Sequence, residues 1–224
     1  MKIAEIFYSI QGEGMLAGVP SVFVRTSGCN LRCTWCDTPY TSWQPEGEER
    51  DIESIAAEVE RYAASHVVLT GGEPMIAPQM DELTHRLKQH ITIETAGTVD
   101  AQVRCDLMSI SPKLANSTPQ QRDAGRWAAQ HDRLRYQPEI LKRLTQLYPH
   151  QLKFVIANPG DMTEVNAIVE ATGVRKTRVL LMPEGVEPVV LAERGRWIAE
   201  ICKKEGYRFS PRMHIELWGN RRGT

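Results

Sequence analysis

Three cysteines with a regular spacing lie near the start of the chain, in the segment Gly28-Cys29-Asn30-Leu31-Arg32-Cys33-Thr34-Trp35-Cys36. Their pattern is Cys-x3-Cys-x2-Cys, and the aromatic Trp35 directly precedes the third cysteine. Three thiolates on one short loop can bind three irons of a 4Fe-4S cubane, whereas a structural cluster ordinarily takes four cysteines. The fourth iron then stays open. The spacing therefore predicts a catalytic cluster at Cys29, Cys33 and Cys36.

An open iron can chelate the amino and carboxylate groups of a methionine derivative. This would place the sulfonium of S-adenosylmethionine (SAM) beside an electron donor, and reductive cleavage would then give a 5'-deoxyadenosyl radical. On spacing alone, the alternative is a zinc site with His66 or His214 as the fourth ligand. Cys105 and Cys202 lie far from the other three cysteines, and we expect them to be small buried residues without a ligand role.

A second motif, Thr70-Gly71-Gly72-Glu73-Pro74, follows the apolar run 66–69. Glycines at the end of a strand let the backbone approach a ligand closely, and exposed peptide groups there can bind the ammonium of a cofactor. The alternative is a simple turn between a strand and a helix. Behind a cysteine triad, the motif favours a cofactor site.

The elements that must position these motifs alternate along the chain. Apolar or β-branched runs predict strands at 21–26, 66–70, 91–95, 107–111, 152–156, 179–182 and 214–217. Periodic apolar patterns predict helices at 51–65, 80–89, 138–147, 163–171 and 187–205. This alternation predicts an α/β fold with a mainly parallel sheet and functional loops at the carboxyl ends of its strands. Residues 116–136 are polar and weakly periodic, so we expect an excursion from the sheet within a single domain covering 1–224.

Composition restricts the partners. The chain has 224 residues, 42% of them hydrophobic, and a formal net charge of −1. No apolar run is long enough to span a membrane, and the amino terminus does not read as a signal peptide, so we expect a cytoplasmic protein. The basic residues are scattered, which does not favour a nucleic-acid partner.

Together, the cysteine triad and the glycine-rich strand end resemble the radical SAM superfamily. Within it, the chain resembles the 7-carboxy-7-deazaguanine synthase family. The similarity lies in the segments 5–14, 18–20, 23–25, 36–38, 93–98, 109–113 and 214–220. It is firmest before residue 114 and vague from 116 to about 136.

This resemblance implies a roughly six-stranded partial β/α barrel of the radical SAM type. It implies conversion of 6-carboxy-5,6,7,8-tetrahydropterin to 7-carboxy-7-deazaguanine with release of ammonia, in queuosine and deazapurine biosynthesis. The implied cofactors are a 4Fe-4S cluster, SAM and Mg²⁺. The implied partners are the pterin substrate, a second copy of the chain in a homodimer, and a reducing protein such as flavodoxin or ferredoxin.

The resemblance also implies a substrate site. The backbone of Ile10 and the residues Gln11 and Gly12 match the strip that reads the pterin edge, and the alternative is a glycine-rich turn. Arg25 is expected to pair with the substrate carboxylate, or alternatively with an acid such as Glu13. Thr70 would face the substrate.

For the cofactor, the resemblance places Gly72 at the SAM ammonium and Trp35 near the adenine. It places Ser111 and Lys113 at the ribose or carboxylate; alternatively, Lys113 is a solvated charge at a strand end. The resemblance also implies that the adenine pocket is lined by three residues at the end of a later strand, Met182, Pro183 and Glu184. The alternative is that these three residues form a plain loop.

Thr38 matches the position where the family has a hydroxyl ligand to Mg²⁺, an ion that prefers oxygen ligands. The alternative is a threonine that caps a turn between Asp37 and Pro39. The tail around His214 is expected to supply the last strand of the barrel and to fold over the substrate.

Two other functions compete with the synthase. A glycyl-radical activating enzyme shares the cysteine triad but needs an open groove for a peptide. A non-enzymatic iron-sulfur or zinc module would use the cysteines only structurally. Anaerobic reconstitution separates these readings, because a module yields no 5'-deoxyadenosine and an activating enzyme yields no deazapurine.

Overall fold

The computed structural model describes all of residues 1–224. The chain folds around one curved sheet of nine strands. The strand order is β3-β1-β2-β4-β5-β6-β7-β8-β9. The neighbours from β2 to β9 are all parallel, whereas β1 is antiparallel to β2 and β3. The strands are β1 Lys2–Ile10, β2 Pro20–Thr26, β3 Glu48–Glu49, β4 His66–Gly71, β5 His90–Thr95, β6 Leu107–Ile110, β7 His150–Ile156, β8 Val179–Pro183 and β9 Arg208–Phe209.

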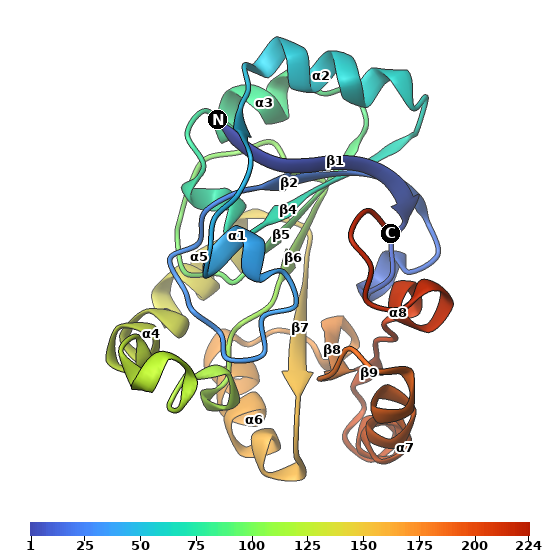
Figure 1. The fold of residues 1–224 in the computed structure, drawn as a ribbon. Helices are drawn as coiled ribbons and strands as arrows, with labels where there is room; N and C mark the ends of the chain where they lie inside the picture. The colour runs from blue at the N-terminus through green and yellow to red at the C-terminus, as the bar shows by residue number, and fades with distance from the viewer.

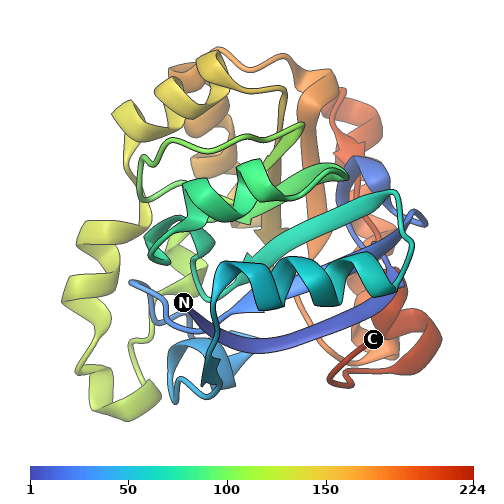
Figure 2. The ribbon, with the colours of Figure 1, turned by 90° about the horizontal axis from the view of Figure 1, so that it is seen from above.

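Helices cover the outer face of this sheet (Figure 1), and seen from above α2 and α3 lie over its first strands (Figure 2). The helices are α1 Pro39–Ser42, α2 Ile52–Arg61, α3 Met80–Arg86, α4 Ala128–Arg135, α5 Pro138–Leu147, α6 Met162–Thr172, α7 Pro188–Glu205 and α8 Met213–Trp218. No helix is long and apolar enough to cross a membrane.

Local sequence signals set the ends of the helices. The carboxylate of Asp51 accepts a hydrogen bond from the Ser54 amide at 2.7 Å, which caps the start of α2. Pro138 begins α5, where a missing N–H costs nothing. Gly173 and Gly206 end α6 and α7 with φ of +67° and +79°, a backbone conformation that favours glycine.

Alternation along each strand separates the core from an inner surface. Leu152, Phe154 and Ile156 of β7 belong to the hydrophobic core that the strands share with the outer helices. Lys153 and Val155 point the other way and line a cavity. Successive side chains of a strand face opposite sides of the sheet, so each parallel strand contributes alternately to the core and to the cavity.

The predicted α/β class and the roughly six-stranded parallel barrel are confirmed, because β2 and β4 to β8 form the main parallel run. Strand β1 was not predicted. A register irregularity between Ile3 and Glu5 breaks the alternation that marks a strand in sequence. Residues 116–136 leave the sheet between β6 and α5, and they contain short 3₁₀ turns and α4.

The predicted strand at 214–217 is wrong, because these residues lie in helix α8. The sequence His-Ile-Glu-Leu alternates polar and apolar residues, which is the period of a strand. Burial does not follow that alternation: Ile215 is fully buried, whereas Leu217 is 57% exposed. The last wall of the barrel is therefore helical, and Gly219 ends it with φ of +74°.

Candidate functional site

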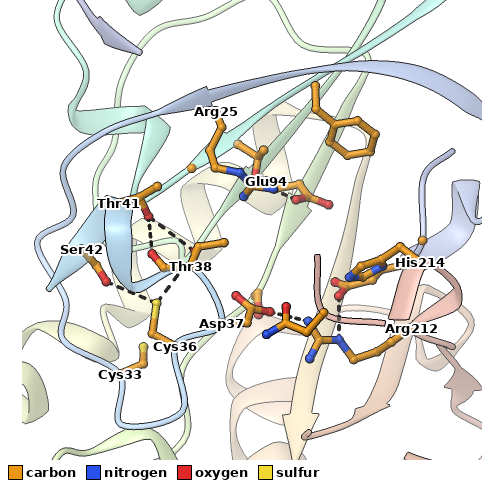
Figure 3. A pocket seen from close by; sticks show the side chains of 18 of the residues that line it. Arg25, Cys33, Cys36, Asp37, Thr38, Thr41, Ser42, Glu94, Arg212 and His214 are labelled. Atoms are coloured by element: carbon orange, nitrogen blue, oxygen red, sulfur yellow. Dashed lines mark hydrogen bonds and ion pairs between the residues drawn. The ribbon is translucent and has the colours of Figure 1, made fainter. Parts of the chain in front are cut away.

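A cavity of about 540 Å³ opens at the carboxyl ends of the parallel strands. Its lining comes from nearly every strand of the sheet, from the loop after β2 and from the last residues of the chain. Figure 3 shows Cys33 and Cys36 at one end of this cavity and the side chains of Arg212 and His214 at the other. Parallel α/β folds place ligand sites at this edge because the strand ends and their loops converge there.

Cys29, Cys33 and Cys36 all line this cavity, and all three are free. Burial raises the pKa of the Cys29 and Cys33 thiols to about 12. Cys36 Sγ lies 3.2 Å from Ser42 Oγ. Cys105 and Cys202 do not line the cavity; Cys202 is buried as expected, whereas Cys105 is only half-buried.

The donor set fits an iron-sulfur cubane. Three soft thiolates on one loop face a cavity with room on its other side, and thiolates are the usual protein ligands of such clusters. No three His, Cys, Asp or Glu side chains in the chain gather closely enough to hold one metal ion. A cubane does not require such convergence, because each thiolate binds a different iron.

The residues predicted to contact SAM lie around the cysteine loop. Lys113 Nζ donates to Ser111 Oγ at 2.8 Å and lies 5.7 Å from the centre of the Trp35 ring. Trp35 Nε1 donates to the Asn116 carbonyl at 3.1 Å. Trp35, Ser111 and Lys113 thus form one wall of the cavity beside the cysteines.

Gly72 is where two backbone segments come closest. A Cβ at this position would lie 2.0 Å from the Gly28 carbonyl oxygen, so only glycine fits. The Gly72 amide donates to the Thr26 carbonyl at 3.2 Å. That leaves the Gly72 carbonyl as the group able to accept a hydrogen bond from a cofactor ammonium.

The three residues predicted for the adenine pocket differ in position. Met182 and Glu184 line the cavity, whereas Pro183 is buried at the end of β8 and does not line it. Glu184 also forms an ion pair with Arg194. Only Met182 therefore presents an uncommitted side chain to the cavity.

The predicted substrate strip lies across the cavity from the cysteine loop. Gln11 is buried; its Nε2 donates to Glu94 Oε1 at 3.2 Å, and its Oε1 accepts from the Glu13 amide. Thr70 Oγ1 donates to the other oxygen of Glu94 at 2.9 Å. Gln11 and Thr70, which were predicted from separate motifs, thus both donate a hydrogen bond to the carboxylate of Glu94. Ile10 and Gly12, beside Gln11, also line the cavity.

Gly12 also fixes the tail of the chain. A Cβ on Gly12 would lie 2.0 Å from His214 Nδ1, and the Met213 amide donates to the Gly12 carbonyl at 2.9 Å. Residues 220–224 line the same cavity. Although the tail is helical where we expected a strand, it does cover the predicted substrate strip.

Arg25 is the penultimate residue of β2 and lines the cavity. Its Nε donates to Glu5 Oε1 at 2.7 Å, and Tyr40 donates to the same oxygen at 2.8 Å. Burial alone would lower the pKa of Arg25, but Tyr40 and Glu5 raise it above its ordinary value. The alternative partner named from sequence, Glu13, is not the one found.

Glu13 instead joins a buried charge cluster that the sequence did not predict. It pairs with Lys153 and with Arg212 Nε at 3.0 Å, and Arg212 also pairs with Asp37. Burial would raise the pKa of Glu13, but Lys153 and Arg212 outweigh it and hold that pKa well below its usual range. The one signal in the sequence was Lys153, a single charge inside an otherwise apolar strand.

Glu94 is the second acid that the sequence did not single out. It lies 3.9 Å from Lys153 Nζ and accepts the hydrogen bonds of Gln11 and Thr70. It sits at an inward-facing position of β5, next to Thr95. The strand alternation of β5 marks the position as inward, although nothing in the sequence ties it to a partner.

Thr38 lines the cavity between the cysteine loop and the charge cluster (Figure 3). It precedes α1, but its side chain makes no capping hydrogen bond to that helix. The Thr38 hydroxyl lies 3.8 Å from Cys36 Sγ and 3.4 Å from Thr41 Oγ1. The residue lines the cavity, and the missing capping bond disfavours the turn-capping alternative.

Comparisons with known proteins agree with this geometry. Residues 23–117 match the radical SAM superfamily. The chain is 45% identical to a 7-carboxy-7-deazaguanine synthase of Halobacterium salinarum, over 98% of this chain and 91% of that one. A synthase of the same name from Rhodopirellula baltica is also 45% identical, over 100% of this chain and 89% of that one.

The fold has a counterpart among solved structures. A crystal structure of QueE from Escherichia coli superposes with a TM-score of 0.68 and is 26% identical, covering 93% of this chain and 92% of that one. The coverage of both chains means that the shared architecture extends over nearly the whole of each.

Proposed function

This chain belongs to the 7-carboxy-7-deazaguanine synthase family of radical SAM enzymes, and we propose that it carries out the ring contraction for which that family is named. The substrate is 6-carboxy-5,6,7,8-tetrahydropterin, and the products are 7-carboxy-7-deazaguanine and ammonia. This reaction serves deazapurine biosynthesis, including that of queuosine.

The observation that carries the proposal is one cavity with two chemically distinct ends. One end has three free thiols, and the other has Gln11, Glu94 and Thr70 joined by hydrogen bonds, with Arg25 beside them. A volume of about 540 Å³ lies within the usual range for small-molecule sites. Amide and carboxylate groups match the ring donors of a pterin, and a guanidinium matches its carboxylate.

The chain's own residues bind and orient in this scheme. The cluster and SAM, when bound, supply the radical that begins the reaction. Arg25 holds the substrate carboxylate, and Glu94 with Gln11 fixes the ring edge. The tail after Arg212 excludes water from the cavity. Because it covers the cavity, the tail does not favour the open peptide groove that a glycyl-radical activating enzyme needs.

The cofactor contacts follow the cavity wall. Cys29, Cys33 and Cys36 bind the cluster, and the Gly72 carbonyl accepts from the SAM ammonium. The other side chains hold the rest of SAM: Trp35, Ser111, Lys113, Met182, Pro183 and Glu184. Pro183 contributes from behind the wall by fixing the backbone between its two neighbours.

Thr38 binds Mg²⁺ in this proposal. It lines the cavity, and Asp37, the neighbouring acid, is engaged by Arg212. Mg²⁺ keeps several waters and needs only one or two protein ligands, so one hydroxyl and the substrate oxygens suffice.

The remaining proposals concern the whole molecule. A single continuous sheet supports one domain over 1–224. Four exposed apolar side chains on the last elements support a homodimer: Val189, Phe209, Leu217 and Trp218. A net charge of −1 does not favour nucleic acid as a partner. The enzyme works in the cytoplasm, with a reducing protein as electron source.

Anaerobic reconstitution with iron and sulfide, followed by incubation with SAM, dithionite and the carboxylated pterin, tests the proposed reaction. We expect 7-carboxy-7-deazaguanine, measured by mass spectrometry, to form only when SAM, reductant and substrate are all present. Production of 5'-deoxyadenosine without any deazapurine would refute the proposed substrate while leaving the radical SAM assignment intact.

A further inference from the structure

The segment 116–136 is bonded to the cysteine loop from the outside. The Thr34 amide donates to the Ser117 carbonyl at 2.8 Å, and the Arg32 amide donates to His131 Nδ1 at 3.1 Å. Thr34 and Arg32 are the two chain neighbours of Cys33. The segment 116–136 therefore packs against the cysteine loop at both chain neighbours of Cys33.

Three arginines make the surface of this region positive. We name Arg32, Arg122 and Arg126, with the rings of Trp43 and Trp127, the arginine face. Arg122 lies 4.0 Å from the Trp43 ring centre, whereas Arg32 and Arg126 lie 5.1 Å and 5.3 Å from that of Trp127.

The charges of the arginine face are not neutralised within the chain. None of its three arginines forms an ion pair, whereas Arg25, Arg135 and Arg212 elsewhere in the chain each pair with an acid. One exposed acid, Asp123, lies in the same segment, and Asp132 is engaged by Arg135. A net positive surface remains.

The arginine face has a short connection to a cluster ligand. Trp43, which supports Arg122, donates from Nε1 to the Cys33 carbonyl at 3.0 Å. Arg122 Nη1 donates to the Thr34 carbonyl at 2.9 Å. A partner seated on this face therefore contacts side chains that are themselves in contact with Cys33 or its neighbours.

We infer that the arginine face is the docking surface of a one-electron donor protein whose surface around its redox centre is acidic. This inference rests on the proposed function, because a radical SAM enzyme must be reduced from outside. In each encounter the donor is oxidised by one electron and the cluster is reduced by one electron, and no atom is transferred. Complementary charge steers such brief encounters and sets their rate.

A charge reversal on the exposed Arg126 tests the docking surface. The Arg126 guanidinium lies over the Trp127 ring and makes no hydrogen bond or ion pair, so Arg126→Glu leaves the bonds to the cysteine loop intact. With flavodoxin as the probe, binding to the cluster-loaded enzyme is measured by biolayer interferometry at several salt concentrations. We expect about tenfold weaker binding at low salt, a flatter salt dependence, and an intermediate value for Arg126→Gln.

Arg196→Glu is the matched control, because Arg196 is exposed on α7 and also lacks an ion pair. It makes the same change in net charge, and we expect it to bind flavodoxin like the parent. Flavodoxin-driven cleavage of SAM should fall in Arg126→Glu, whereas dithionite-driven cleavage should match the parent.

Two results would overturn the docking surface: parental flavodoxin binding by Arg126→Glu, or equal weakening in Arg196→Glu. Failure of the proposed function is distinguishable from both. In that case the parent makes no deazapurine with dithionite, while the binding measurements still report on the arginine face.

Discussion

Arg25 Nε donates to Glu5 Oε1 at 2.7 Å, across the antiparallel pair that β1 and β2 form. The two residues are register partners, and both line the cavity. Glu5 also accepts from Tyr40 at 2.8 Å, so this carboxylate fixes one edge of the guanidinium. The bond uses Nε and leaves the terminal nitrogens of Arg25 to face a ligand.

This relationship predicts graded effects of two substitutions on substrate binding. Arg25→Lys removes the planar fork that matches a carboxylate, and we expect KM for the carboxylated pterin to rise at least tenfold. Glu5→Gln keeps one acceptor but lowers the charge that orients Arg25, so we expect a smaller rise in KM. Steady-state kinetics measures both, and Arg86→Lys at the exposed Glu53 pair is the control. An unchanged KM in Arg25→Lys would mean that another residue binds the carboxylate.

The cysteine assignment predicts a sharp division among the five cysteines. Replacing Cys29, Cys33 or Cys36 by alanine should abolish the parental electron paramagnetic resonance signal and all cleavage of SAM, because each thiolate holds one iron. Cys105→Ala and Cys202→Ala should retain parental iron content. Loss of iron in either control, or turnover by the Cys33 variant, would show that the ligands are wrong.

Lys153 is a buried cation, and its removal would leave a buried carboxylate without its main partner. Its side chain is 6% exposed and pairs with Glu13. Burial would lower the pKa of Lys153, but Glu13 and Glu94 raise it above its ordinary value. Lys153→Met leaves Glu13 with fewer partners, and we expect a loss of about 3 kcal/mol of unfolding free energy.

Urea denaturation measures this loss. The double variant Glu13→Gln/Lys153→Met removes both charges and should recover part of the stability, because no buried carboxylate is then left short of a partner. Lys88→Met, whose side chain is 80% exposed, should be neutral. Additive losses in the double variant would show that the two charges are not coupled.

His131 predicts a pH dependence of stability. It is buried, accepts from the Arg32 amide, and lies 2.9 Å from Ser117 Oγ through Nε2. Burial lowers the pKa of His131 to about 4. An unfolded histidine has a pKa of about 6.5. Between these values the unfolded chain binds more protons, so stability is lost as the pH falls from about 6.5 toward 4.

The contribution of His131 amounts to roughly 2 kcal/mol between pH 7 and pH 5. Urea unfolding at a series of pH values measures it as a difference between the parent and His131→Gln. We expect a flatter pH profile in this variant, whose amide can still accept from Arg32. His85→Gln, on an exposed helix surface, should keep the parental profile. A parental slope in His131→Gln would contradict the neutral, buried state of this imidazole.

The sequence was most informative where function and local pattern coincide. The cysteine loop, the strand ends at Thr70 and Ser111, and the apolar faces of the outer helices all follow from spacing and period. Strand β1 was missed because its irregularity near Glu5 hides the alternation. The tail was assigned the wrong class because His214 to Leu217 alternates like a strand, whereas it folds as helix α8 and packs against Gly12.

The charge cluster could not be predicted in the same way. Glu13, Lys153 and Arg212 come from three distant parts of the chain, and only folding brings them together. Charged residues are usually solvated, so a single lysine in an apolar strand indicates a buried ion pair but does not identify the acid that pairs with it. Pairwise contacts of high sequence separation leave no periodic signal, whereas a motif on one loop does.

Thr38 carries the last prediction, which concerns Mg²⁺. The residue lines the cavity, and its hydroxyl caps no helix and lies 3.8 Å from the thiol of Cys36. If Thr38 is the protein ligand, Thr38→Ala should lower deazapurine formation at least tenfold and blunt its response to added Mg²⁺. Thr38→Ser keeps the oxygen and should retain much of both. Iron content and cleavage of SAM without substrate should match the parent in the two variants, which separates a metal role from damage to the cysteine loop. Thr41→Ser, a change to the neighbouring hydroxyl that lies 3.4 Å from that of Thr38, is the control for local packing. An alanine variant with the parental Mg²⁺ dependence would place the ion elsewhere.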